Sequence, residues 1–244
     1  MDINFLFLYS CSQNFAFAKY MLKKMARWSG LGYLFIFITA FFATGFVVEA
    51  MVVPQDAAAT WANFKAAPHM LSWAIISFIV MVLIDAILAI PFYLLLKSVN
   101  QTLAQISSAL RLVNATVFAV ALMDLISLRR LLDKPYQGDE LFILRQVDHF
   151  SQSFDDTWLL GLIFFGVHLM IMGYLMIRSA HFPSWIGGLI QLAGLVYIID
   201  SVASFSMSNY EHYTAFFEIM VVIPSVLGEL SFCLFLLIKG IKQK

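Results

Sequence analysis

Six long stretches of hydrophobic residues alternate with short polar segments along the chain. They cover about residues 30–53, 70–97, 103–127, 157–178, 184–206 and 215–239. A helix needs about 20 residues to cross the apolar core of a bilayer, so each stretch is long enough to span it. The stretches are continuous rather than alternating, which does not fit the strands of a membrane barrel. The pattern therefore predicts an all-α, polytopic bundle of six transmembrane helices.

Composition supports lipid as the solvent of this chain. Hydrophobic residues make up 61% of the sequence and charged residues only 12%, whereas soluble domains carry about 25% charged residues. The formal net charge is zero and no basic run is present, so no nucleic-acid partner is expected. We expect a multi-pass protein of the cell (plasma) membrane whose main partner is the lipid bilayer.

Lysine and arginine are unevenly divided between the two sides of the predicted membrane. Of the 15 basic residues, ten fall on the side that holds both termini and five on the other. Cytoplasmic loops carry an excess of these residues, so the N- and C-termini are expected in the cytoplasm. The ten are Lys19, Lys23, Lys24, Arg27, Lys97, Arg111, Arg178, Lys239, Lys242 and Lys244.

The chain divides into an N-terminal segment, residues 1–28, and a six-helix transmembrane domain, residues 29–244. The N-terminal segment mixes aromatic residues with a basic end, which is the reverse of the charge order in a secretory signal. One interpretation is an amphipathic helix at the membrane interface. The other is a non-native extension, with translation beginning naturally at Met21 or Met25.

Two polar loops contain predicted short helices. Residues 54–66 begin with Pro54, Gln55 and Asp56 and read as a helix capped by the aspartate, lying on the membrane surface. Residues 138–153 form a second surface-lying candidate, because apolar residues recur on one side of a helix there. Those residues are Leu141, Leu144, Val147 and Phe150.

Similar segments recur in the spans. Three spans end in an aromatic residue, three apolar residues, a cation and a small residue, at 93–98, 174–179 and 235–240. A fainter repeat places Gly30-Leu31-Gly32-Tyr33 and Gly194-Leu195-Val196-Tyr197 in two other spans. The chain is either three related hairpins or a set of unrelated helices with ordinary interfacial ends.

Ionisable residues inside the hydrophobic stretches are the main candidates for function. Asp85, His168 and Glu229 fall near the middle of their spans, and Asp200 lies nearer the end of its own. A charged side chain at the bilayer centre costs roughly 2.5 kcal/mol or more, so it is a candidate for a functional site by default. Carboxylates and an imidazole can pass protons, and we expect Asp200 to extend such a path outward.

Three further residues are secondary candidates. Glu49 and Asp124 lie near span ends and could line the mouth of a proton path, and Arg111 is a natural ion-pair partner for one of the acids. The sequence contains none of the common hydrolase, phosphate-binding or Cys-x-x-Cys motifs, so no cofactor is predicted and no catalytic residue is assigned. A divalent metal held by Asp85, His168 and Glu229 is the alternative.

Several motifs together resemble a known family. They are Trp28-Ser29-Gly30-Leu31-Gly32-Tyr33-Leu34, Pro54-Gln55-Asp56-Ala57-Ala58-Ala59-Thr60 with Asn63, Gly161 to Leu169, Gly173-Tyr174-Leu175, Gly194 to Ser201, and Pro224 to Leu230 ending at Lys239-Gly240. Over about residues 26–240 the chain resembles the bacterial membrane-protein family called domain of unknown function 4386. The resemblance implies a six-helix integral membrane protein with no established activity.

Three functions fit the sequence. The leading hypothesis is a small transporter or permease-like protein that moves a small molecule or ion, with a proton path through Asp85, His168, Glu229 and Asp200. The second is an intramembrane enzyme that uses a metal held by the three midplane residues. The third is a non-catalytic accessory or sensor subunit whose polar residues bind a partner helix.

Overall fold

The structure, a computed structural model, describes the backbone of residues 3–133 and 139–241 and the side chains of residues 20–133 and 139–241. Within these ranges the chain is helical and contains no strand. Six helices are long and apolar enough to cross a membrane, which confirms the predicted fold class. The elements are α1 (Ile3–Phe41), η1 (Phe42–Val48), α2 (Glu49–Met51), α3 (Ala57–Ala66), α4 (Pro68–Leu96), α5 (Gln101–Asp133), α6 (Glu140–Arg178), α7 (Ser184–Ser206), η2 (Tyr210–Tyr213) and α8 (Thr214–Ile238).

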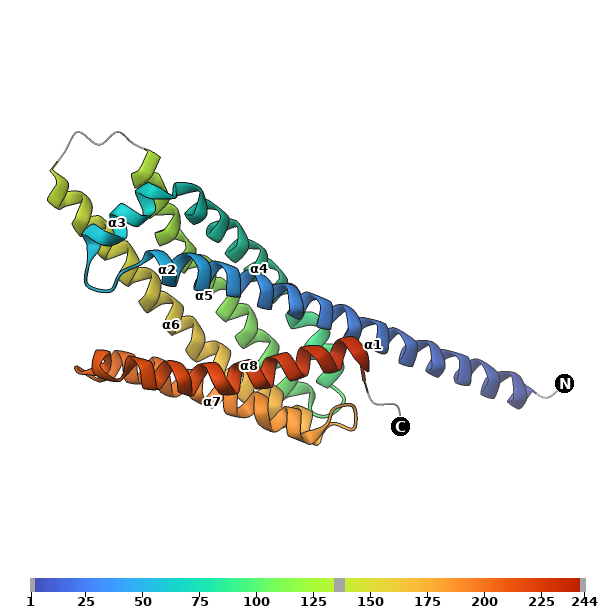
Figure 1. Ribbon diagram of the computed structural model, residues 1–244. Coiled ribbons are helices and arrows are strands. Elements are labelled where there is room, and N and C mark those ends of the chain that lie inside the picture. The colour runs from blue at the N-terminus through green and yellow to red at the C-terminus, as the bar shows by residue number, and fades with distance from the viewer. Residues whose placement is uncertain (1–2, 134–138, 242–244) are drawn as a thin grey trace.

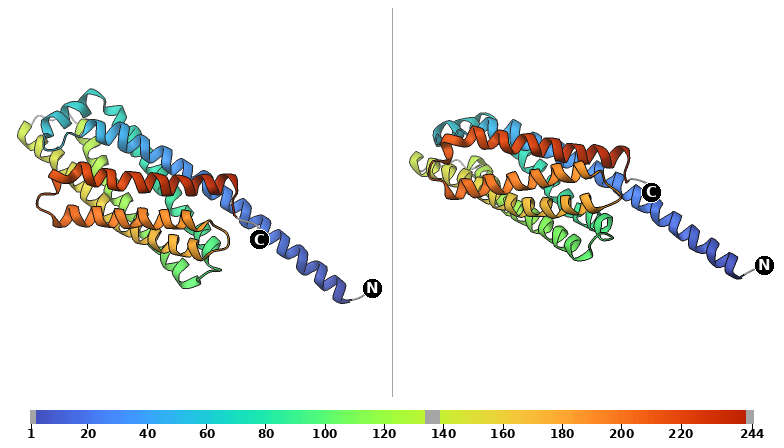
Figure 2. Two further views of the ribbon diagram at one scale, coloured as in Figure 1. Left: turned by 60° about the horizontal axis from the view of Figure 1, so that its bottom comes forward. Right: turned by 90° about the horizontal axis from the view of Figure 1, so that it is seen from below.

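The long helices form one bundle in which neighbours in sequence are neighbours in space. α4 packs on α5, α5 on α6, α6 on α7 and α7 on α8. α1 contacts both α4 and α8, so the last helix returns to the first (Figures 1 and 2). Because the ring closes in this way, α8 lies between α1 and α7, a position that matters for the candidate site.

The first helix is longer than its predicted span. α1 runs without a break from Ile3 to Phe41, and its N-terminal part extends beyond the end of the bundle (Figures 1 and 2). The predicted boundary at residue 28 therefore falls inside a continuous helix. The helix continues through a π-helical segment, Phe42–Val48, which the sequence did not predict. Segments of this kind are rare and are often found at functional sites.

The predicted surface helix at residues 138–153 is instead the beginning of α6, and residue 138 lies outside the described residues. α6 runs from Glu140 to Arg178 in one piece. Neither proline nor glycine occurs between Glu140 and Leu160, so nothing in the sequence stops the helix from continuing into the span. Of the four apolar residues that predicted the surface helix, Val147 is buried and Leu144 and Phe150 are half-buried against the bundle, whereas Leu141 is 52% exposed.

The other predicted short helix is confirmed. α3 begins after Asp56, whose carboxylate accepts a hydrogen bond of 2.8 Å from the backbone N–H of Ala59. Trp61 and Phe64 are buried where α3 contacts α4 and α6. The helix is thus attached to the bundle by its aromatic side chains.

The interior has two apolar clusters. One contains Leu88, Phe92 and Leu169, together with residues from the middle of α1 and the end of α8. The other contains Phe78, Phe118 and the side chains that α3 covers. Asp85 and Arg111 lie between the two clusters along α4 and α5, so the buried polar groups form a layer near the middle of the bundle.

Glycines allow α6 and α7 to approach closely. A Cβ atom on Gly194 would lie 2.5 Å from the backbone oxygen of Gly166, and one on Gly173 would lie 2.5 Å from that of Gly187. Such contacts are shorter than any packing distance between a side chain and backbone. Small residues where two membrane helices cross let the backbones come into contact. Within a membrane the hydrophobic effect does not drive helices together, and this close van der Waals packing does so instead.

We expect Gly194→Ala to destabilise the protein by about 1–3 kcal/mol, the usual cost of overpacking. The added methyl must push α6 away from α7. Gly188→Ala in the same helix is the matched control, because a Cβ atom there meets nothing within 4 Å. Thermal unfolding in detergent measures both, and an equal effect of the two substitutions would contradict this account of the crossing.

Candidate functional site

Arg111 lies at the centre of the buried polar layer. Its side chain is 0% exposed. The guanidinium forms an ion pair with the Asp85 carboxylate, and its Nε–H donates to the Asp85 backbone oxygen at 3.1 Å. Its Nη1 lies 3.1 Å from Nε2 of His168. One arginine from α5 thus holds an acid of α4 and an imidazole of α6. The sequence pattern placed Arg111 among the cations of the side that holds both termini, whereas the structure places it at the bundle centre.

The hydrogen bonds determine the state of His168. A guanidinium only donates, so Nε2 of His168 must accept and cannot carry a proton. The other nitrogen, Nδ1, lies 2.8 Å from the backbone oxygen of Ser107 and carries the ring proton toward it. The Ser107 hydroxyl lies 2.9 Å from Nδ1 and donates to the His168 backbone oxygen at 3.3 Å. His168 is therefore a neutral imidazole with both nitrogens in use.

Aromatic rings enclose the remaining surface of the guanidinium. The Arg111 Cζ atom lies 5.5 Å from the ring centre of Tyr33, 5.0 Å from that of Phe92 and 5.6 Å from that of Phe165. A cation over an aromatic face gains roughly 2 kcal/mol or more when water is excluded. The rings come from α1, α4 and α6, so this one side chain joins α5 to three neighbouring helices.

Asn114 completes the environment of Asp85. Its Nδ2 lies 3.3 Å from Oδ2 of Asp85, one helical turn along α5 from Arg111. Both carboxylate oxygens of Asp85 therefore have a donor. Ser107, Asn114 and the aromatic rings were not candidates in the sequence, since such residues are common in any membrane helix.

Glu229 forms a second group. Two tyrosine hydroxyls contact its carboxylate, Tyr33 to Oε2 at 2.7 Å and Tyr197 to Oε1 at 3.0 Å. These are the tyrosines of the two repeated segments, Gly30 to Tyr33 in α1 and Gly194 to Tyr197 in α7. The repeat was therefore a usable signal for these two site residues, although the sequence did not indicate which acid they would meet.

Close helix contacts bring the two tyrosines to Glu229. A Cβ atom on Gly30 would lie 2.8 Å from Cβ of Leu236, so α1 and α8 approach closely. A Cβ atom on Gly228 would lie 3.0 Å from the backbone oxygen of Leu189, so α8 and α7 do the same. Glu229 follows Gly228 directly and is thereby placed between its two neighbouring helices.

Asp200 lies nearer the end of the bundle that holds α3. It is 8% exposed, and the Tyr210 hydroxyl donates to its Oδ1 at 2.6 Å. Tyr210 also lines a pocket of about 490 Å³ whose other residues are Glu49, Gln152, Asp155, Asp156, Trp158, Leu159, Ser204 and Glu218. Glu49, predicted to line the mouth of a path, is part of this pocket. Asp124 is half-buried in α5 and belongs to none of these groups.

The three midplane candidates therefore occupy two groups rather than one. Arg111 joins Asp85 to His168, while Glu229 is held by tyrosines. Tyr33 connects the two groups, because its hydroxyl contacts Glu229 and its ring lies against Arg111. Within the described parts of the chain, no three His, Cys, Asp or Glu side chains are grouped so that they could hold a metal ion.

The fold and its buried polar layer define a multi-pass helical membrane protein. The chain belongs to the family described as domain of unknown function DUF4386, whose model matches residues 28–240. It is similar to an uncharacterized protein of Archaeoglobus fulgidus, with 30% identity over 172 residues that cover 70% of this chain and 85% of that protein. No solved structure matches. The family resemblance seen in the sequence is thus confirmed.

Proposed function

We propose that this chain is a small membrane transporter that moves protons, with Glu229 as the group that takes up and releases them. The observation that carries the proposal is the balance of charge at the two connected groups. Two carboxylates, Asp85 and Glu229, share the environment of one cation, Arg111, and His168 is neutral. A second positive charge is needed to avoid a net charge inside the membrane, where each costs several kcal/mol. A proton on Glu229 supplies it.

The partners of Glu229 suit a group that changes its protonation state. An ionised carboxylate accepts from both Tyr33 and Tyr197. A protonated carboxyl can donate to one of these hydroxyls and accept from the other, because a tyrosine hydroxyl both donates and accepts. Glu229 is therefore fully hydrogen-bonded in either state, and neither requires the helices to move apart.

A series of polar side chains supports a route from Glu229 toward the end of the bundle that holds α3. Tyr197, which contacts Glu229, precedes Asp200 by three residues in α7, so the two lie on one face of the helix. Asp200 contacts Tyr210, and Tyr210 lines the acidic pocket at the bundle end. The route thus follows Tyr210, Asp200, Tyr197 and Glu229.

Asp85 and His168 have a different role in this proposal from the one that the sequence suggested. Arg111 is ion-paired with Asp85 and hydrogen-bonded to His168. An arginine does not release its proton in proteins, so these contacts do not pass protons. We assign this group as a fixed ion pair that positions Tyr33 against Glu229. The proton itself is the ion moved in this proposal, and its uptake does not require a further small-molecule or ion cargo. The membrane is the cell membrane. The metal-dependent enzyme has less support, since its proposed ligands are divided between two groups.

Proton uptake into reconstituted vesicles tests the proposal. A potassium gradient with valinomycin makes the vesicle interior negative, and a dye inside reports acidification. We expect vesicles with the protein to acidify faster than protein-free vesicles. Asp200→Asn is expected to slow uptake, whereas Asp124→Asn, an acid of a span outside the route, leaves it unchanged. Equal rates with and without the protein would contradict the proposal.

A further inference from the structure

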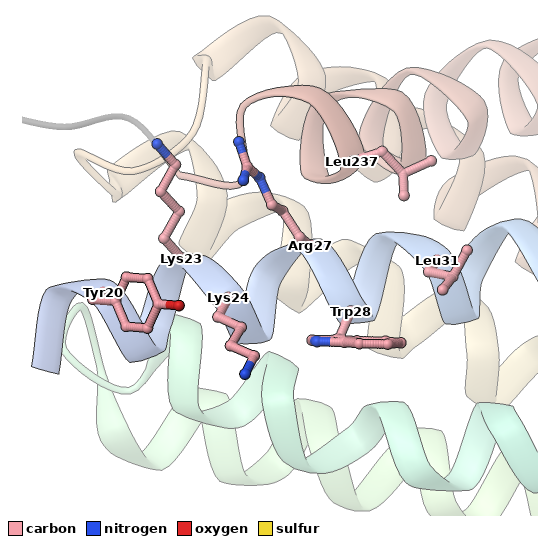
Figure 3. A pocket seen from close by; sticks show the side chains of 7 residues that line it. All are labelled: Tyr20, Lys23, Lys24, Arg27, Trp28, Leu31 and Leu237. Atoms are coloured by element: carbon pink, nitrogen blue, oxygen red, sulfur yellow. The ribbon is translucent and has the colours of Figure 1, made fainter. Parts of the chain in front are cut away.

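A pocket of about 330 Å³ lies where α1 passes the end of α8 (Figure 3). Its residues are Tyr20, Lys23, Lys24, Arg27, Trp28, Leu31 and Leu237. Lys23 and Arg27 extend toward the end of α8, whereas Lys24 and Trp28 lie along the opposite edge (Figure 3). None of these residues belongs to the groups around Arg111 and Glu229, so the pocket is a separate feature.

The residues of the pocket change from charged to apolar along α1. The cations lie at positions 23, 24 and 27, and the apolar residues Leu31 and Leu237 lie deeper in the bundle. From Lys23 to Leu31 the helix rises about 12 Å. The headgroup layer on each side of a bilayer is roughly 5–8 Å thick. The cations can therefore lie among headgroups while Leu31 and Leu237 lie among acyl chains.

The three cations have no acidic partner in the described part of the chain. The ion pairs found there join Arg111 to Asp85 and Arg129 to Asp133, and neither involves the pocket. Three uncompensated positive charges favour an anion, and a guanidinium forms paired hydrogen bonds with phosphate oxygens in particular. The chemistry thus points to a phosphate group.

The walls of the pocket are built by close helix contact. Gly30 lets α1 approach α8 at Leu236 and places Leu237 beside α1. Beyond α8, Gly240 adopts a positive φ of 72°, and a Cβ atom there would lie 3.1 Å from Cγ of Lys23. Trp28 is 63% exposed and Tyr20 is 62% exposed, as aromatic side chains at a membrane interface are.

We propose that this pocket binds one anionic phospholipid. Its phosphate contacts Lys23 and Arg27, and Lys24 adds a positive charge at the opposite edge. The upper part of an acyl chain lies along Trp28, Leu31 and Leu237. A lipid with a cationic headgroup brings a positive charge next to the three cations and binds more weakly. The ordered change from charge to apolar surface favours a lipid over free phosphate. This inference does not depend on the proposed proton transport.

Native mass spectrometry of the detergent-purified full chain tests the site. Phosphatidylglycerol, phosphatidylcholine and glycerol phosphate are added separately, and the bound fraction is measured. Each cation near an anionic lipid surface contributes about fivefold to binding. We therefore expect one phosphatidylglycerol to bind more tightly than phosphatidylcholine. The Lys23→Gln/Lys24→Gln/Arg27→Gln variant should lose roughly 100-fold in phosphatidylglycerol affinity.

Arg27→Gln and Arg178→Gln form a matched pair, because each removes one arginine from the same end of the bundle and Arg178 does not line the pocket. We expect about a fivefold loss for the first and no change for the second. The single substitution also gives the answer if the triple variant does not fold. Equal losses, or equal binding of the two phospholipids, would overturn the proposal. Displacement of phosphatidylglycerol by an equimolar amount of glycerol phosphate would assign the pocket to free phosphate instead.

Discussion

Arg111→Gln is expected to lower the free energy of unfolding by about 3–5 kcal/mol. The substitution leaves the Asp85 carboxylate buried without its counter-ion, and it removes the donor to Nε2 of His168. It also removes the cation that lies against the rings of Tyr33, Phe92 and Phe165. Reversible unfolding in mixed micelles, followed by tryptophan fluorescence, measures the change.

A double-mutant cycle separates the ion pair from the packing. Its variants are Asp85→Asn, Arg111→Gln and the two together. The double variant removes both charges of the ion pair and should recover part of the loss caused by Arg111→Gln alone. Arg178→Gln removes an arginine at the bundle end, over the ring of Tyr174, and is expected to cost less than about 1 kcal/mol. If Arg111→Gln were as mild as Arg178→Gln, the central ion pair would not hold the bundle together.

Glu229→Gln is expected to reduce potential-driven proton uptake to the rate of protein-free vesicles. Loss of a positioned group that transfers a proton typically lowers a rate by about 100-fold or more. Glutamine keeps the size of the side chain and can still meet Tyr33 and Tyr197, so the fold is expected to persist. Vesicle acidification and the unfolding midpoint are measured on the same preparations.

The control is Asp124→Asn, which removes an acid of a span outside the route. Asp124 is half-buried in α5 and does not line the acidic pocket at the bundle end. Proton uptake by Asp124→Asn should stay close to that of the unchanged protein. If Glu229→Gln took up protons at the rate of the unchanged protein, Glu229 would not be the group that transfers them.

The helices could be predicted from sequence because the bilayer imposes a minimum length on each of them. All six spans were found, and the capped helix at Ala57–Ala66 followed from Asp56. The error at residues 138–153 has a physical origin. Apolar residues on one side of a helix fit a membrane surface as well as a protein surface. Here Val147 of α6 is buried in the apolar cluster that α3 covers.

The site could be predicted only in part. Position within a span identified four candidates, Asp85, His168, Glu229 and Asp200. The free energy of placing an ionisable side chain in the membrane depends on its depth, and depth can be inferred from the sequence. Which of them meet depends on the rotation of each helix and on close contacts at glycines such as Gly30 and Gly228. The contacts between Glu229 and the two tyrosines follow from helix rotation and these close contacts. The hydropathy pattern does not indicate either feature.

Infrared difference spectroscopy of the reconstituted protein between acidic and alkaline buffer tests the central claim most directly. A protonated carboxyl has its own C=O stretching band, and every carboxyl that titrates between the two buffers contributes to it. Proton uptake by Glu229 therefore appears as the component of the band that Glu229→Gln lacks. We predict that this component is present in the unchanged protein and in Asp124→Asn and is lost in Glu229→Gln. Identical carboxyl bands in the unchanged protein and in Glu229→Gln would contradict the assignment of Glu229 as the proton-carrying group.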